Sequence, residues 1–199
     1  LNFCMEAFMK YFLIVYIICN SFIFSIGQQF VEEFENNKND WYINKSKAEE
    51  VYIEKGNYII KNLDENTGLS LNLTGDITDF FAQEYIWKQI GKENSIYGVY
   101  IELDTKDRFY FVFNNDKIAY LYENEGKMGI LDDFKKFPYL SPEYNSIVFV
   151  KDNNNFTFII NQIPTEKIWT LSSAKIERVG VYIGDLTSLY IDKYTIFRL

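Results

Sequence analysis

Two acidic residues on one predicted strand, Glu102 and Asp104, have the spacing best suited to catalysis. Residues two positions apart point to the same face of a strand, and two carboxyl groups about 5 Å apart can hydrolyse a glycosidic bond with retention. A third acid, Asp107, follows them, but its side chain is too short to serve as the general acid/base beside Glu102 and Asp104. The segment Asp-Thr-Lys-Asp at 104–107 also has the composition of a hairpin turn, which would separate the carboxylates. We therefore favour a charged hairpin tip over a catalytic pair.

Glu84 is a second candidate acid. It has the same strand parity as Phe80, Ala82 and Ile86, which predicts that it faces the core. A buried, unpaired carboxylate has a raised pKa, and a raised pKa suits a catalytic acid. We favour instead a bulge in the strand that lets the carboxylate reach solvent.

A set of aromatic and polar side chains is expected to bind a ligand. If one strand parity faces the core, the other faces outward, where rings stack on apolar sugar faces and carboxylates or amides hydrogen-bond hydroxyls. The expected core-facing residues are Phe80, Ala82, Ile86, Val99, Ile101, Leu103, Phe109, Phe111 and Phe113. The predicted ligand-binding residues are Tyr85, Trp87, Tyr100, Glu102 and Tyr110, with Gln83 nearby. Tyr and Trp favour strands in any case, so a face covered by loops or a partner stays an alternative.

The composition excludes several kinds of site. The chain has 199 residues, no His, two Cys, and 28 acidic against 20 basic residues, giving a net charge of −8. Without His there is no Ser–His or Cys–His nucleophile pair and no imidazole metal site. The negative charge argues against binding to nucleic acid. A metal site would have to hold a hard cation such as Ca²⁺, with Asn36–Asp40 or Asp185 and Asp192 as candidates. We predict solvated loops there, and therefore no metal and no cofactor.

Residues 1–27 have the three regions of a secretory signal peptide. Lys10 is followed by an apolar run and then by Ser25-Ile26-Gly27, which predicts cleavage before Gln28. Met9 is the expected initiator, so residues 1–8 would be an upstream translation artefact. A transmembrane anchor is the alternative, but the apolar run is short for a span of about 20 residues. We predict an exported protein, whether periplasmic, on the cell surface or extracellular, with residues 28–199 as one domain that has no membrane span.

The mature chain has the pattern of an all-β protein. Short runs rich in Tyr, Phe, Ile and Val alternate with Asn, Asp, Gly and Lys clusters, which predicts a sandwich or barrel. The expected strands are 51–53, 58–60, 69–73, 80–89, 97–103, 108–114, 117–123, 147–151, 156–160, 179–183 and 190–199. Two short segments, 28–35 and 130–137, are the candidates for helices.

The order of these strands resembles exported bacterial domains with the concanavalin A-like lectin/glucanase jelly roll, in the laminin-G-like and sugar-hydrolase-like variants. The resemblance rests on Asn39-Asp40-Trp41, Gly56-Asn57-Tyr58, Asp79-Phe80-Phe81-Ala82, Tyr97-Gly98-Val99-Tyr100, Asn155 to Gln162 and Ile191-Asp192-Lys193-Tyr194. It departs from the family at Ile101-Glu102, where Trp-Gly is frequent, and at Gln162, where a hairpin Gly is usual. The resemblance implies a two-sheet antiparallel jelly-roll sandwich.

Three functions are compatible with this fold, because fold alone does not decide function. We predict a non-catalytic domain that binds carbohydrate or another extracellular polymer through an aromatic concave sheet face. The first alternative is a glycoside hydrolase that uses Glu102 with Asp104 or Glu84. The second is a structural or interaction module of a surface assembly, with an extracellular protein as its partner.

Overall fold

The computed structural model describes residues 28–74, 77, 80–91, 95–171 and 174–198, and these residues form fifteen strands. The predicted signal peptide and initiator therefore lie outside the described residues. Within the described ranges, no helix has the length and hydropathy needed to cross a membrane.

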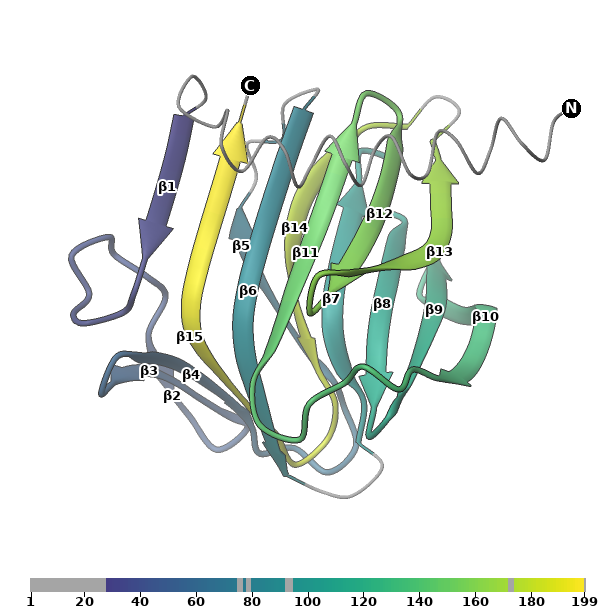
Figure 1. The fold of residues 1–199 in the computed structure, drawn as a ribbon. Coiled ribbons are helices and arrows are strands. Elements are labelled where there is room, and N and C mark those ends of the chain that lie inside the picture. The colour runs from purple at the N-terminus through teal and green to yellow at the C-terminus, as the bar shows by residue number, and fades with distance from the viewer. Residues whose placement is uncertain (1–27, 75–76, 78–79, 92–94, 172–173, 199) are drawn as a thin grey trace, which may run out of the picture.

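The strands form two antiparallel sheets that pack face to face as a sandwich (Figure 1). The nine-stranded sheet consists of β1 (Gln28–Glu32), β2 (Asn44–Lys45), β3 (Glu49–Glu54), β4 (Asn57–Asn62), β6 (Phe80–Gly91), β11 (Asn145–Asp152), β12 (Asn155–Ile160), β13 (Ile163–Thr170) and β15 (Thr187–Arg198). The six-stranded sheet consists of β5 (Leu69–Thr74), β7 (Tyr97–Leu103), β8 (Arg108–Asn114), β9 (Lys117–Asn124), β10 (Lys127–Lys136) and β14 (Ile176–Ile183). The predicted all-β sandwich is confirmed.

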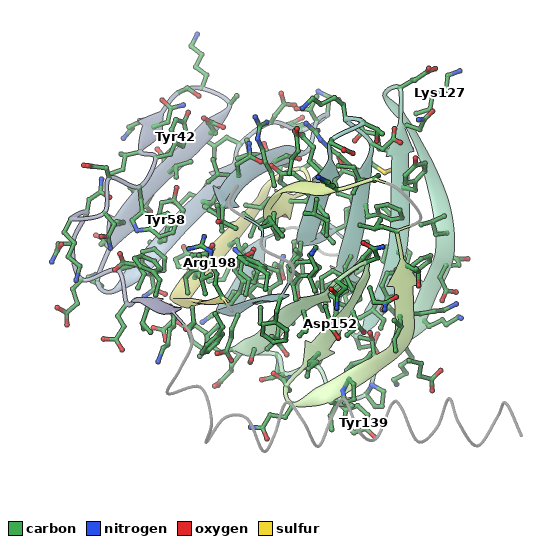
Figure 2. All side chains as sticks on the ribbon, turned by 90° about the horizontal axis from the view of Figure 1, so that it is seen from above. Tyr42, Tyr58, Lys127, Tyr139, Asp152 and Arg198 are labelled. Atoms are coloured by element: carbon green, nitrogen blue, oxygen red, sulfur yellow. The ribbon has the colours of Figure 1, made fainter. Side chains whose placement is uncertain are left out.

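The strand order shows how distant parts of the chain meet. The nine-stranded sheet has the order β13-β12-β11-β6-β15-β4-β3-β2, and β1 pairs with β15 beyond the end of β4. The six-stranded sheet has the order β10-β9-β8-β7-β14-β5. In Figure 2 the two sheets are seen as layers, with Tyr42 after β1 and Lys127 at the β9–β10 tip on opposite sides of the molecule.

Tight turns set the register of hairpins in both sheets. Lys55 and Gly56 connect β3 to β4 with positive φ angles of 51° and 72°, the geometry of a hairpin turn that matches strand twist. Strands β7 and β8 are joined by residues 104–107 and pair from Glu102–Arg108 to Tyr97–Phe113. Both strands end at the residues predicted from the sequence.

The core lies between the sheets and is rich in aromatic rings. On β7 and β8, Val99, Ile101 and Phe111 face this core, as predicted. On β6 the predicted parity is wrong: Phe81, Tyr85 and Trp87 face inward instead of Phe80, Ala82 and Ile86. The inward parity buries three large rings and leaves the charged Glu84 and Lys88 on the outside, which avoids the cost of burying charges.

Two further expectations are corrected. The segments predicted as candidate helices are the strands β1 and β10. Glu84 needs no bulge to reach the outside, because it lies on the outer face of the nine-stranded sheet, paired with Val148 and Thr195. The carboxylate of Glu84 accepts a hydrogen bond from Ser146 Oγ at 2.7 Å.

Candidate functional site

The structure separates the five predicted ligand-binding residues into two groups. Tyr85 and Trp87 lie in the core between the sheets, with only 0% and 1% of their surface exposed. Trp87 stacks on Tyr85 at 5.3 Å and makes edge contacts with Tyr97 and Phe113 at 6.1 and 5.8 Å between ring centroids. The expectation that all five residues share one face is therefore wrong, and the inverted parity of β6 is the reason.

The other three residues, Tyr100, Glu102 and Tyr110, do share a face. They lie on the side of the six-stranded sheet that is turned away from the core, which we call the outer face. The outer face comprises Asn72, Gly98, Tyr100, Glu102, Arg108, Tyr110, Val112, Ala119, Leu121, Glu123, Arg178, Gly180 and Tyr182. Tyr100 and Tyr110 pack with Val112, Ala119 and Leu121 in a second apolar cluster.

Glu102 is the centre of the polar part of this face. Its Oε2 accepts hydrogen bonds from Arg108 Nε at 3.0 Å and Arg108 Nη2 at 2.8 Å. Its Oε1 accepts a hydrogen bond from Arg178 Nη1 at 3.0 Å. Charge-assisted bonds to a guanidinium fork fix geometry strongly. We call Arg108, Glu102 and Arg178 the Arg–Glu–Arg cluster.

The alternation of β14 brings Arg178 into this cluster. Val179, Val181 and Ile183 face the core, so Arg178 lies on the outer face, where it pairs with Glu102. Ile176 pairs with Leu103, the neighbour of Glu102, so Glu177 is an extra residue in β14. This β-bulge lets Ile176 face the core as well.

Tyrosines form the base on which the cluster rests. The Arg108 guanidinium lies 5.6 Å above the ring of Tyr100, a cation–π distance. The hydroxyl of Tyr100 donates to Asn72 and that of Tyr110 donates to Glu123. Burial raises the pKa of Tyr100 to about 12, although the nearby Arg108 opposes the shift. The hydroxyl therefore stays protonated at neutral pH and acts as a hydrogen-bond donor.

Two glycines make room for the rings of the outer face. A Cβ on Gly180 would lie 2.7 Å from Tyr100 Cε1 and 2.2 Å from the carbonyl oxygen of Leu71. A Cβ on Gly68 would lie 2.3 Å from the hydroxyl oxygen of Tyr182, whose ring makes an edge contact with Tyr110 at 5.3 Å. The glycines thus allow the rings to lie close to the sheet.

Solved structures of carbohydrate-active enzymes share this architecture. The chain superimposes on the catalytic domain of an endo-1,3-beta-glucanase (laminarinase) from Thermotoga petrophila RKU-1 with a TM-score of 0.59 and 10% identity, covering 86% of this chain and 98% of that one. A laminarinase from Flavobacterium sp. UMI-01 gives 0.59 and 8% identity over 85% and 99% of the two chains. The Bacillus licheniformis beta-glucanase gives 0.59 and 10% over 88% and 100%. The fold is the concanavalin A-like jelly roll. No protein-family model matches the sequence, and no curated protein matches it.

The candidate hydrolase residues of this jelly roll are not brought together. Asp104 lies in the turn after β7, where its Oδ1 accepts a hydrogen bond from the backbone N–H of Lys175 at 3.1 Å. Glu102 lies on the strand with both oxygens bound by guanidinium groups. Glu84 is in the other sheet, on its outer face. The predicted turn at 104–107 is confirmed, and it separates Asp104 from Glu102.

The loop candidates for Ca²⁺ do not fit a metal site. Among the residues that the structure describes, no group of three or more His, Cys, Asp or Glu side chains could hold a metal ion. In the loop 36–40, the side-chain oxygen of Asn37 accepts from the Trp41 backbone N–H at 2.7 Å, and Asn39 donates to Glu32. Asp185 and Asp192 lie in the β14–β15 connection and in β15 itself. The side-chain oxygens of Asn36 and Asn37 are thus used in closing the loop.

The sequence analysis missed the residues that complete the outer face, above all Arg108 and Arg178. Arg108 was accessible to prediction, since a hairpin that closes at 103–107 pairs residue 102 with residue 108. Arg178 was also accessible to prediction, because Val179, Val181 and Ile183 alternate toward the core and so place Arg178 on the opposite face, but the expected strand began one residue later, at 179.

Proposed function

We propose that the protein is an exported, non-catalytic domain that binds carbohydrate through the outer face of the six-stranded sheet. One observation carries the proposal: a row of hydrogen-bonding groups on a rigid sheet face. The row runs across four strands as Arg178, Glu102, Arg108 and Glu123. Guanidinium and carboxylate groups held in fixed positions are suited to bind the hydroxyls of a polysaccharide.

The fold supports this choice of ligand. The structures with which the chain superimposes are named as a laminarinase and beta-glucanases, which act on polysaccharides. Because identity is about 10%, this similarity supports the class of ligand and not a particular sugar.

The arrangement of carboxylates supports binding without hydrolysis. A retaining glycosidase needs two carboxyl groups about 5–5.5 Å apart, one of them able to donate a proton. Glu102 is bound by Arg108 and Arg178, and Asp104 lies in the turn. We expect no release of reducing sugar from laminarin or mixed-linkage β-glucan. Release by the wild type that is lost in Glu102→Gln would instead establish the glycoside hydrolase.

The proposal of export rests on the sequence of residues 1–27. We expect N-terminal sequencing of the protein recovered from its native host to give Gln28. An N-terminus at Met9 would contradict cleavage.

Affinity electrophoresis tests the proposed function. The purified protein is run through gels that contain laminarin, mixed-linkage β-glucan, polygalacturonate or κ-carrageenan, and at least one gel is expected to retard it. The double variant Arg108→Ala/Arg178→Ala should lose that retardation. Lys106→Ala, which changes an exposed residue of the β7–β8 turn paired with Glu177, should keep it. The proposal fails if no gel retards the protein, or if the double variant, folded by circular dichroism, is retarded like the wild type.

An interaction module is the second candidate function, and the edge strand β10 is the observation that favours it. Met128, Ile130 and Leu131 are exposed by 49%, 65% and 43% on this unpaired edge. Lys127 and Asp133 stand three residues on either side of Ile130, so an antiparallel second copy centred there would pair opposite charges. A dimer in light scattering that Ile130→Asp converts to monomer would support this function, and a monomeric wild type would exclude self-association through β10.

A further inference from the structure

The charges of the Arg–Glu–Arg cluster lie at different depths. The side chain of Glu102 is 5% exposed, whereas those of Arg108 and Arg178 are 34% and 47% exposed. The carboxylate is therefore covered by the two guanidinium groups that bind it. A ligand that approaches this part of the outer face meets cationic groups first.

Arg178 keeps part of its hydrogen-bonding capacity for a ligand. Within the described part of the chain, its partner is Glu102, bound through Nη1. The Nε and Nη2 groups of the same guanidinium are left to point at other acceptors. A guanidinium presents its donors as a planar fork that matches the two oxygens of a carboxylate or a sulfate.

Arg178 lies at the end of the row that is opposite the acidic residue Glu123. Arg178 stands at one end of the row on β14, and Glu123 stands at the other end on β9. Neighbouring strands are about 4.8 Å apart, so roughly 14 Å separates the two positions. Glu123 accepts a hydrogen bond from Tyr110 and lies 4.0 Å from Arg108 Nη1. The acidic end of the row is thus distant from Arg178 and engaged with its own neighbours.

We infer that the polysaccharide bound at the outer face is acidic, with a carboxylate or sulfate group seated on the Arg178 guanidinium beside Arg108. This inference rests on the proposed function and names its ligand class. The position of Arg178 supports it, because the alternation of Val179, Val181 and Ile183 toward the core turns Arg178 outward. General attraction of polyanions is absent, since the whole chain carries a net charge of −8.

Binding of three polysaccharides by the purified protein tests the inference. Laminarin is neutral, polygalacturonate carries carboxylates and κ-carrageenan carries sulfates. We expect binding to one or both acidic polymers to be at least about tenfold tighter than binding to laminarin, as one added charge-assisted hydrogen bond would give. The acidic polymer that binds identifies the group that Arg178 takes.

Two variants with the same change of charge make the test specific. Arg178→Gln should weaken binding of the acidic polymer about tenfold to hundredfold, and any binding of laminarin by a smaller factor. Lys106→Gln also removes one positive charge near the same end of the sheet, and it should change affinity less than about twofold because Lys106 lies in the turn. Arg178→Lys should restore part of the affinity, since it keeps the charge without the fork.

The outcomes separate this inference from the proposed function. Binding of laminarin as tight as that of the acidic polymers, or a folded Arg178→Gln variant with wild-type affinity, overturns the acidic ligand and leaves carbohydrate binding in place. Absence of binding to every polymer overturns the proposed function and this inference with it. Equal losses in Arg178→Gln and Lys106→Gln would show a general charge effect and would also overturn the inference.

Discussion

Arg178 and Glu102 face each other across β14 and β7, with Nη1 of the arginine 3.0 Å from Oε1 of the glutamate. The pair lies on the outer face because Val179, Val181 and Ile183 alternate toward the core and turn Arg178 away from it. Arg178 is thereby placed where a ligand can reach it. The same contact neutralises a carboxylate that is otherwise almost covered.

Removal of Glu102 should destabilise the protein more than removal of Arg178. Glu102→Ala leaves both Arg108 and Arg178 without their acceptor, and we expect a loss of about 1–3 kcal/mol in the free energy of unfolding. Arg178→Ala should cost at most about 1 kcal/mol, because its side chain is half exposed and Glu102 keeps Arg108. Urea denaturation of both variants and of the double variant measures the coupling. Strictly additive losses would contradict a direct interaction.

A pair of glycine substitutions tests the close packing of the outer face. Gly180→Ala places a Cβ 2.2 Å from the carbonyl oxygen of Leu71, so we expect a destabilisation of about 1–3 kcal/mol and displacement of the Tyr100 ring. Gly129 is the matched control, because a Cβ there would have its nearest neighbour, the Tyr122 carbonyl oxygen, at 3.8 Å. Gly129→Ala should be neutral or stabilising by about 0.5–1 kcal/mol. Equal melting temperatures of the two variants would refute the packing at Gly180.

Trp87 should affect stability and not ligand binding. Its ring is buried against Tyr85, Tyr97 and Phe113, so Trp87→Ala is expected to lower the free energy of unfolding by about 3–5 kcal/mol. Tyr139→Ala, at a residue 55% exposed, should change stability by less than about 0.5 kcal/mol. A Trp87→Ala variant that has wild-type stability but no longer binds the ligand would show instead that Trp87 belongs to the binding site.

Glu32 should make part of the stability depend on pH. Burial opposes its ionisation, but hydrogen bonds from Trp41, Asn39 and the Phe34 backbone outweigh burial and lower the pKa. Because the folded pKa lies below the unfolded one, this stability is fully present above about pH 4.5 and is lost as the pH falls through the folded pKa.

The variant Glu32→Gln isolates this contribution. At neutral pH it should be less stable than the wild type, because the neutral amide offers one acceptor oxygen in place of two. Between about pH 5 and pH 3 its free energy of unfolding should fall less steeply than that of the wild type. A wild-type slope in Glu32→Gln, measured by urea denaturation across this range, would show that the carboxylate does not carry the effect.

The hairpin of β7 and β8 shows what the sequence could predict. Turn residues bound both strands, and alternation is clean on β8, so the shared face of Tyr100, Glu102 and Tyr110 followed directly. The strand β6 has apolar side chains on both of its faces. The charged residues Glu84 and Lys88 decide which face is turned away from the core. An amide such as Gln83 can be buried against Tyr194, whereas a charge cannot be buried cheaply.

The edge strand β10 shows why other elements could not be predicted. Ile130 pairs with Leu121 of the outer face, and Phe134 packs on the same face. Ile130 and Phe134 are therefore four residues apart on one face of the strand. Two irregularities in the pairing, between Ile130 and Asp132 and between Asp132 and Lys135, allow this spacing. A spacing of four is the period of a helix, so the sequence of a bulged strand imitates one.

The position of β15 sets an order of events for the assembly of this fold. This strand lies inside the nine-stranded sheet and pairs with β6, β4 and β1. The sheet therefore cannot close until β15 has been synthesised. Closure depends on contacts between β15 and strands that lie about a hundred residues or more before it, and contacts so distant in sequence slow folding.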